Sequence, residues 1–182
     1  AIDKRFLLFE DPGTDCFRIF NSSGDGIDGL TADYYEGYIL IKFFNLSAKE
    51  IIKTFHNKLN ACFPLPLKAV LCKNRVTPVR KGNSDYLWES LILEGDYPPD
   101  GITVKQNGIK ACVDLVSGQN TGIFLDMREA RKKLEDFYTS GTIKKMLNLF
   151  SYTALFSVHA LKNGMYSAIN VDLSKNVLNR AR

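Results

Sequence analysis

A loop whose chemistry suits an anion occupies residues 116–131, V-S-G-Q-N-T-G-I-F-L-D-M-R-E-A-R. Gly118 and Gly122 permit tight turns, and Asp126 has the residue type and position of a helix N-cap. Gly141 is placed as the glycine that follows a helix end. Because the first turn of a helix leaves backbone N–H groups free, such a loop favours a carboxylate or phosphate ligand. The same residues also suit a purely structural cap, and the local pattern favours that simpler role.

Three stretches resemble motifs of one enzyme family. G-Q-N-T-G-I-F-L-D-M-R (118–128) resembles the G-Q-K-T-G-[FY]-F-L-D-Q-R signature of class I S-adenosylmethionine-dependent methyltransferases, in the group of the bacterial 23S ribosomal RNA cytosine-C5 enzymes. Asn120 stands where that family usually has Lys, and Met127 where it has Gln. R-I-F-N-S-S-G-D-G-I-D-G-L-T-A-D-Y-Y (18–35) resembles R-x-x-N-x-E-x-D-G-x-P-G-L-x-x-D-x-Y, which opens the family's central domain.

The third stretch, N-L-F-S-Y-T-A-L-F-S (148–157), resembles the family's first Rossmann turn, D-L-F-C-Y-T-G-G-F-S. Asn148 replaces the acid, and Ala154 and Leu155 replace both glycines. In the family these glycines let the backbone approach the methionine part of the methyl donor. A Cβ atom at each position therefore narrows that space.

The resemblance implies a site for S-adenosylmethionine, built from the loop, the first turn and the end of the second Rossmann strand. By match to the motifs, its residues are Gln119, Thr121, Gly122, Phe124, Asp126, Arg128, Tyr152, Thr153 and Asp172. Asp172 lies about twenty residues after the first turn, where a Rossmann unit places the acid that holds the ribose hydroxyls. A carboxylate can accept hydrogen bonds from both hydroxyls.

Charge is spread unevenly along the chain. Residues 1–103 carry 12 Lys and Arg against 14 Asp and Glu, whereas residues 104–182 carry 12 against 6. A basic half suits a polyanion such as RNA but does not identify one. The acid-free stretch K-N-R-V-T-P-V-R-K suggests RNA-phosphate contacts through Lys73, Arg75, Arg80 and Lys81. A solvated loop is the alternative, and composition favours it.

Scattered cysteines argue against a metal centre and against a disulfide framework. Cys16, Cys62, Cys72 and Cys112 form no Cys-x-x-Cys pair, and the chain has only two histidines. We therefore expect free thiols in a reducing cytoplasm and no metal. None of the four matches the family's catalytic cysteine motifs, so no catalytic residue is assigned. No apolar run approaches the ~18–20 residues of a membrane span, and no signal peptide is recognisable, so we expect a cytoplasmic protein without a membrane partner.

The predicted fold has three parts. Residues 1–15 form a lead-in, and residues 16–101 form a small α+β central domain of order β-β-α-β-β, whose helix opens with the capping box S-x-x-E at 47–50. Residues 102–182 form a hairpin with an Asn107-Gly108 turn, followed by the N-terminal portion of an α/β Rossmann-type methyltransferase domain. The linker Y-P-P-D-G precedes this last part.

The Rossmann part is expected to be incomplete in this chain. The pattern predicts a strand over 146–150, a helix over 154–161, a strand over 167–171 and a last helix capped by Ser174. The family's sheet has seven strands, its Asp-Pro-Pro loop and catalytic cysteines lie further on, and a PUA domain usually comes first. The resemblance therefore implies an inactive 182-residue chain within a longer enzyme; whether Arg182 is a natural end stays open.

The intact enzyme is expected to methylate C5 of a cytosine in ribosomal RNA. In that reaction a cysteine thiolate attacks C6 of the base and makes C5 nucleophilic. Two alternatives stay open: a non-catalytic RNA-binding or assembly module derived from the family, favoured by the missing glycines, and a methyltransferase with a non-RNA substrate. Asp126, Arg128 and Asp172 speak against the first. The sequence leaves the target nucleotide and the oligomeric state open, a homodimer included.

Overall fold

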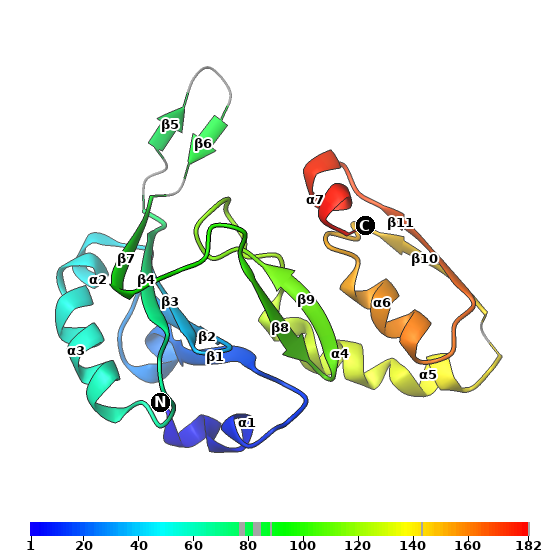
Figure 1. The fold of residues 1–182 in the computed structure, drawn as a ribbon, viewed down its shortest axis with the longest axis horizontal. Helices are drawn as coiled ribbons and strands as arrows, with labels where there is room; N and C mark the ends of the chain where they lie inside the picture. The colour runs from blue at the N-terminus through cyan, green and yellow to red at the C-terminus, as the bar shows by residue number, and fades with distance from the viewer. Residues whose placement is uncertain (77–78, 82–84, 88, 143, 182) are drawn as a thin grey trace.

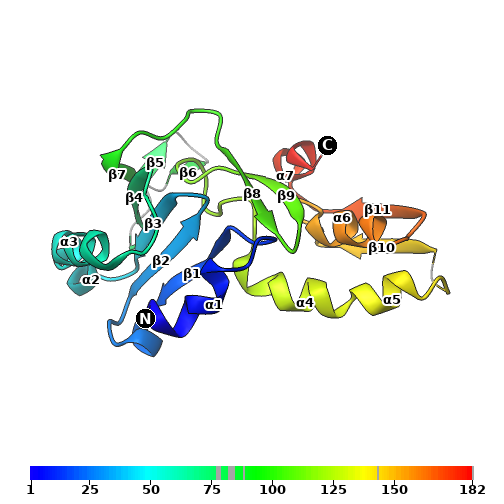
Figure 2. The same cartoon turned by 60° about the horizontal axis from the view of Figure 1, so that its bottom comes forward.

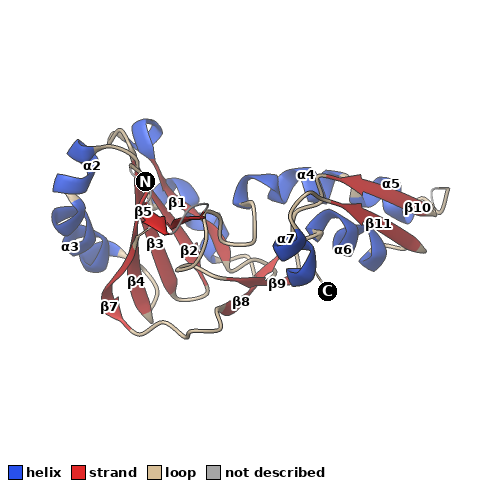
Figure 3. Ribbon diagram, turned by 90° about the horizontal axis from the view of Figure 1, so that it is seen from above, coloured by secondary structure: helices blue, strands red, loops and turns tan. Residues whose placement is uncertain are grey.

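The fold has two lobes joined by two consecutive helices, α4 (Arg128–Lys133) and α5 (Glu135–Thr139). The computed structural model describes residues 1–76, 79–81, 85–87, 89–142 and 144–181. The larger lobe holds a five-stranded mixed sheet, and the smaller one holds two parallel strands with their helices (Figure 1). Seen from above, the lobes lie at opposite ends of an elongated molecule (Figure 3).

The large sheet contains five strands in the spatial order β1-β2-β3-β4-β7. Neighbouring strands are antiparallel except for β3 and β4, which are parallel. A parallel pair needs a crossover, which two helices supply between β3 and β4. The strands are β1 (Cys16–Asn21), β2 (Leu30–Tyr35), β3 (Tyr38–Phe43), β4 (Ala69–Asn74) and β7 (Ser90–Gly95).

Three helices cover one face of this sheet: α1 (Phe6–Phe9), α2 (Leu46–Glu50) and α3 (Ile52–Cys62). These helices lie beside the strands (Figure 2), and their apolar side chains meet those of alternate strand residues in the larger core. Phe9 packs edge-on against Phe17 with ring centroids 5.0 Å apart. The expected lead-in is therefore packed on the sheet. Short 3₁₀ turns precede α1 (η1, Asp3–Arg5) and follow β1 (η2, Ser22–Asp25).

The opposite face of the sheet carries the hairpin β8 (Ile102–Gln106) and β9 (Ile109–Val113). Asn107 and Gly108 turn the chain with φ of 51° and 70°, which confirms the predicted two-residue hairpin. Val104 and Val113 pack there against Leu40 and Leu71 of the sheet in a second buried cluster. The hairpin thereby holds the loop that follows it against the sheet.

Strand alternation puts four charged residues on this same face. Cys16, Tyr35, Leu40 and Leu71 belong to the cluster under the hairpin. Side chains two residues along a strand share its face. The register therefore places Arg18, Asp33, Lys42 and Lys73 on that face, toward one end of four neighbouring strands. We call these four residues the charged row.

The strand order corrects the expectation for the central domain. Three strands, not two, precede the helices, because the chain from Leu30 to Phe43 folds back on itself at a turn where Glu36 and Gly37 adopt φ of 46° and 92°. The last strand of the sheet is β7, and a separate hairpin, β5 (Val79–Lys81) with β6 (Asp85–Leu87), precedes it in the chain. That hairpin projects away from the sheet (Figure 1).

The predicted capping box at 47–50 is wrong. Asn45 is the N-cap of α2, since its backbone is extended and its side chain accepts the N–H of Ala48 at 2.7 Å. Ser47 already lies inside the first turn. A cap must stand outside the helix, and the backbone leaves helical geometry two residues before Ser47. The expected single helix is also interrupted at Ile51, between α2 and α3.

The smaller lobe confirms the predicted βαβ unit. β10 (Lys145–Leu149) and β11 (Ser167–Val171) are parallel neighbours, joined by α6 (Leu155–Lys162). Ser174 caps α7 (Lys175–Arg180) by accepting the N–H of Val177 at 3.4 Å, as predicted. Gly141 follows the end of α5 with φ of 74°, which also agrees with the prediction.

Candidate functional site

The carboxylate of Asp172 connects the two strands of the smaller lobe at their carboxyl ends. Its Oδ2 accepts the backbone N–H of Tyr152 at 2.9 Å, and its Oδ1 accepts that of Ser174 at 2.9 Å. These bonds, that of Ser174 first, lower the pKa of Asp172 and keep it ionised. Ligands of open α/β sheets bind at this edge. Asp172 therefore lies where the sequence placed it.

The loop preceding η3 (Leu125–Met127) contacts the turn that follows β10. Thr153 donates its hydroxyl to the carbonyl of Gly122 at 2.7 Å. The rings of Phe124 and Tyr152 lie 4.9 Å apart. Together with the Tyr152–Asp172 bond, these contacts join five of the nine expected donor-site residues in one place: Gly122, Phe124, Tyr152, Thr153 and Asp172. We call these five the donor cluster.

Left-handed backbone at residues with a side chain distinguishes the turn after β10. Phe150, Tyr152 and Ala154 have φ of 54°, 49° and 60°. Non-glycine residues seldom adopt this region, and strained backbone gathers at ligand sites. Ala154 is the position where the resembling motif has glycine. Leu155, the second such position, packs against the core under the hairpin, so its side chain is directed to the core.

Gly122 is required by space as well as by backbone angle. Its φ is 108°, and an added Cβ would lie 3.0 Å from the carbonyl oxygen of Cys112 and 3.1 Å from the guanidinium of Arg180. Any side chain would therefore press against the backbone of β9 and against the Arg180 side chain of α7. The glycine lets loop, hairpin and α7 meet at one point.

The other four expected residues lie outside the donor cluster. Thr121 is buried and directs its hydroxyl to Tyr35, 3.3 Å away. Gln119 has an exposed side chain, and its backbone carbonyl accepts a bond from Arg75. Arg128 pairs with Glu129 at 2.7 Å. Asp126 is exposed in the 3₁₀ turn η3, and its predicted N-cap role is wrong, because α4 begins two residues later without a side-chain cap.

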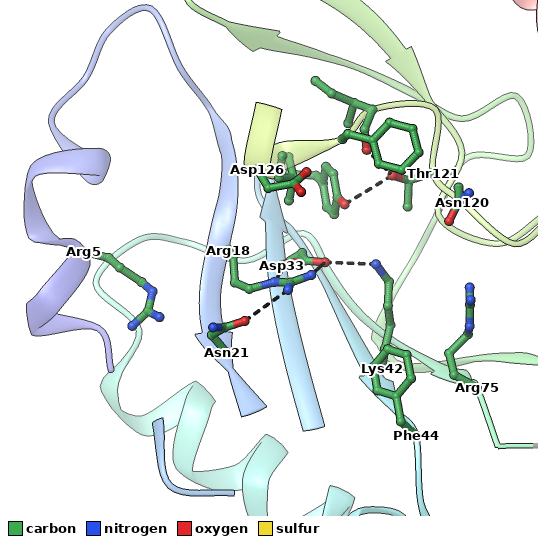
Figure 4. Close-up of a pocket in the computed structure, with 14 residues that line it drawn as sticks. Arg5, Arg18, Asn21, Asp33, Lys42, Phe44, Arg75, Asn120, Thr121 and Asp126 are labelled. Atoms are coloured by element: carbon green, nitrogen blue, oxygen red, sulfur yellow. Dashed lines mark hydrogen bonds and ion pairs between the residues drawn. The ribbon is translucent and has the colours of Figure 1, made fainter. Parts of the chain in front are cut away.

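A cavity of ≈ 530 Å³ lies between three residues of the charged row, Arg18, Asp33 and Lys42, and residues 120–126 of this loop (Figure 4). Arg18 and Lys42 bind Asp33 from two sides, through Nε at 2.8 Å and Nζ at 3.0 Å. Burial would raise the pKa of Asp33, but Lys42 and Arg18 outweigh it and lower that pKa. Asp33 is thus an ionised, buried anchor for two cations. Asp126 contributes a second acid on the loop side (Figure 4).

Comparison with known proteins identifies the family. A family model described as S-adenosylmethionine-dependent methyltransferase matches residues 17–182. The chain belongs to this family. The putative ribosomal RNA large subunit methyltransferase YwbD of Bacillus subtilis is 38% identical over 181 residues, which cover 98% of this chain and 43% of the relative. Ribosomal RNA large subunit methyltransferase I of Photobacterium profundum is 33% identical over 178 residues, with coverage of 98% and 43%.

Solved structures agree with this assignment. A putative SAM-dependent methyltransferase from Streptococcus mutans matches with a TM-score of 0.84 at 32% identity, covering 98% of this chain and 44% of that one. SMU.776, a putative methyltransferase crystallised with SAH, matches with a TM-score of 0.83 at 32% identity and coverage of 98% and 43%. The fold is therefore a methyltransferase fold with a mixed sheet and helices, and this methyltransferase-family chain spans less than half the length of these relatives.

The residues expected to contact RNA phosphates have different environments. Lys73 is fully buried in β4, where its Nζ donates to the carbonyl of Gly118 at 3.1 Å, so its expected phosphate contact is wrong. Strand β4 continues through Asn74 and carries Lys73 under the loop. Arg75 lies 5.9 Å from the ring of Phe44 and binds the loop at Gln119. The side chains of Arg80 and Lys81 lie outside the described part of the chain.

Cysteine and metal chemistry have little support in the described residues. Burial raises the pKa of both Cys16 and Cys72 to about 12, so both are thiols at neutral pH. Cys62 and Cys112 are exposed and unpaired with each other. Within the described ranges, no three His, Cys, Asp or Glu residues gather as metal ligands. None of the helices described there is long and apolar enough to cross a membrane.

Sequence reasoning missed most of the cavity. Arg18, Asn21 and Asp33 lie in a motif that indicates the start of the central domain, and Lys42 lies in none of the motifs. These residues also belong to the half of the chain with net negative charge. The available signal was strand alternation, since a charged residue at every second position of several strands predicts a polar sheet face.

Proposed function

We propose that the protein containing this chain transfers the methyl group of S-adenosylmethionine to C5 of a cytosine in large-subunit ribosomal RNA. The observation that carries the proposal is the donor cluster, in which Asp172 at the carboxyl end of β11 binds the turn after β10. The names of the relatives support ribosomal RNA as the substrate. We place the activity in the cytoplasm.

The donor cluster suits the parts of S-adenosylmethionine. Backbone N–H groups orient the Asp172 carboxylate, which has further lone pairs for two ribose hydroxyls. The rings of Phe124 and Tyr152 offer an apolar wall beside it. When bound, the donor supplies the methyl group. The loop residues Gln119, Thr121, Asp126 and Arg128 belong to our proposed site by their match to the family motif alone.

We assign no catalytic nucleophile within residues 1–182. Cys16 and Cys72 are buried thiols with raised pKa values, and such thiols do not attack a pyrimidine ring. We propose that the attacking thiolate comes from a part of the protein outside these residues, and that the 182-residue chain alone is inactive. Its own residues would bind the donor and orient the RNA.

The test uses protein expressed from the whole gene, an unmodified 23S ribosomal RNA transcript and methyl-labelled S-adenosylmethionine. Mass spectrometry of the digested nucleosides should show label in 5-methylcytidine. A 16S transcript and the Asp172→Ala variant serve as controls. Label in another nucleoside would overturn the cytosine assignment, and labelled protein or small molecules without labelled RNA would establish a different substrate.

A non-catalytic RNA-binding or assembly module is the second candidate, because Ala154 carries a Cβ on strained backbone where the family motif has glycine. Calorimetry with S-adenosylmethionine separates the two. Absence of donor binding at millimolar concentration, together with retained RNA binding, would establish the module and refute the enzyme.

A further inference from the structure

Basic side chains outnumber acidic ones in the lining of the cavity between the loop and Arg18, Asp33 and Lys42. Its basic lining residues are Arg5, Arg18, Lys42 and Arg75, and its acidic ones are Asp33 and Asp126. Asp25 binds the guanidinium of Arg5 at 2.6 Å, which balances that one cation. Arg18 and Lys42 share the one carboxylate of Asp33, so these three side chains together carry a net positive charge, which attracts an anion.

Asp33 orients two of these cations and is itself closed to a ligand. Its side chain is only 1% exposed, and both oxygens bind the cations beside it. Bonds to Asp33 and Asn21 use three of the five N–H groups of Arg18, and one bond uses one of three on Lys42. In the described part of the chain, Arg18 and Lys42 thus keep N–H donors for an anion, on rigid strands.

The cavity adjoins the donor cluster through one side chain. Phe124 lines the cavity and also contacts Tyr152 of the donor cluster. Thr121, another lining residue, is adjacent in the chain to Gly122 of that cluster. A molecule held by Arg18 and Lys42 would therefore lie beside the place where the methyl group is expected.

We propose that this cavity receives one nucleotide of single-stranded RNA, with Arg18 and Lys42 binding its phosphate. The cavity volume of ≈ 530 Å³ is larger than the volume of a bare inorganic anion. The rings of Phe44 and Phe124 in the cavity lining suit stacking on a base, and the cations suit a phosphate. An acidic peptide would use the same cations but would gain nothing from stacking. The inference rests on the proposed function for the identity of the substrate, and it adds the residues that bind it.

Direct removal of Arg18 or Lys42 is a poor test, since it leaves the buried Asp33 carboxylate short of a partner and threatens the fold. Asn120 offers a safer position. It lines the cavity from the loop and has an exposed side chain (Figure 4). Asn120→Asp adds a negative charge there, and Asn120→Lys adds a positive one. Lys110→Gln, on the exposed side of β9, is the control with the same net-charge change as Asn120→Asp.

The experiment measures fluorescence anisotropy of a labelled ten-nucleotide oligocytidylate, with protein from the whole gene at about 0.05 M salt, where surface charges are weakly screened. Asn120→Asp should weaken RNA binding by at least about fivefold, and Asn120→Lys should strengthen it by at least about twofold. Lys110→Gln should change it by less than about twofold. Donor affinity, measured by calorimetry, should stay unchanged in all three.

The outcomes separate this inference from the proposed function. If Asn120→Asp and Lys110→Gln alter RNA affinity equally, the cavity is not the RNA site, even where donor binding and methyl transfer persist. Wild-type protein that binds donor but no RNA, or that prefers an acidic peptide, also overturns the inference. Absence of donor binding by the wild type would refute the proposed enzyme. The RNA affinities of the three variants would still decide the role of the cavity.

Discussion

The carboxylate of Asp172 accepts the backbone N–H of Tyr152 at 2.9 Å, although twenty positions separate the two residues in the chain. The bond ties the end of β11 to a turn whose backbone is left-handed at Tyr152 itself. It fixes both the acid that should bind the donor ribose and the turn that should contact the rest of the donor.

Asp172→Ala should weaken S-adenosylmethionine binding by about tenfold or more, because hydrogen bonds from ribose hydroxyls to a charged group are lost. Asp172→Asn keeps one acceptor oxygen and should weaken donor binding less than Asp172→Ala does. Calorimetry on protein from the whole gene measures both, with Asp96→Ala, at an exposed loop position, as the control. Equal donor affinity in wild type and Asp172→Ala would remove Asp172 from the site.

Gly122→Ala should destabilise the protein by about 3 kcal/mol, because φ of 108° is strained for alanine and the added Cβ meets Cys112 and Arg180. Gly118→Ala is the matched control in the same loop. Its φ is 69°, and its Cβ would have its nearest neighbour at 3.9 Å, so only about 1 kcal/mol is expected. Chemical denaturation measures both, and similar losses would contradict the crowding argument.

Ala154→Gly should leave the free energy of unfolding within about 1 kcal/mol of wild type. Relief of left-handed strain contributes ~1–2 kcal/mol. Loss of a buried methyl group destabilises the folded state by ~0.8 kcal/mol. The greater conformational freedom of glycine in the unfolded chain destabilises it by a further ~0.4–1 kcal/mol. The missing Cβ should nevertheless tighten donor binding by about threefold or more. Unchanged donor affinity would mean that this Cβ does not limit the site.

Lys73→Met should remove a pH-dependent part of the stability. Burial, with Lys42 next, lowers the pKa of Lys73 from 10.5 to about 8. Between these values the unfolded chain binds more protons than the folded one, so the stability contribution of Lys73 rises with pH. From pH 7.5 to 9.5, wild type should gain about 2 kcal/mol relative to Lys73→Met.

The comparison with Lys73→Met cancels the contribution of the buried thiols Cys16 and Cys72. Their pKa is raised from 9.0 to about 12, so their contribution to stability changes with pH in the opposite direction. Lys53→Met, the same substitution at an exposed position of α3, is the control for the change of residue type. Denaturant titrations at several pH values provide the measurement. A constant difference between wild type and Lys73→Met would show that Lys73 keeps its ordinary pKa in the folded protein.

The sequence by itself determined the features that depend on a few adjacent residues. The Asn107-Gly108 turn, the cap at Ser174, the glycine after α5 and the strand ending before Asp172 all follow from local backbone preference and short-range alternation. The cap at Asn45 shows the limit of this reasoning, since neighbouring polar residues compete and packing selects one.

Only the tertiary structure decided which side chains share a surface. Arg18, Asp33 and Lys42 come from three strands, and they meet because cross-strand register aligns them on one face. Lys73 became a buried contact of the loop, rather than an exposed cation, because β4 passes under that loop. Register and burial depend on contacts between residues far apart in the chain. The composition and spacing of a single segment therefore do not determine them.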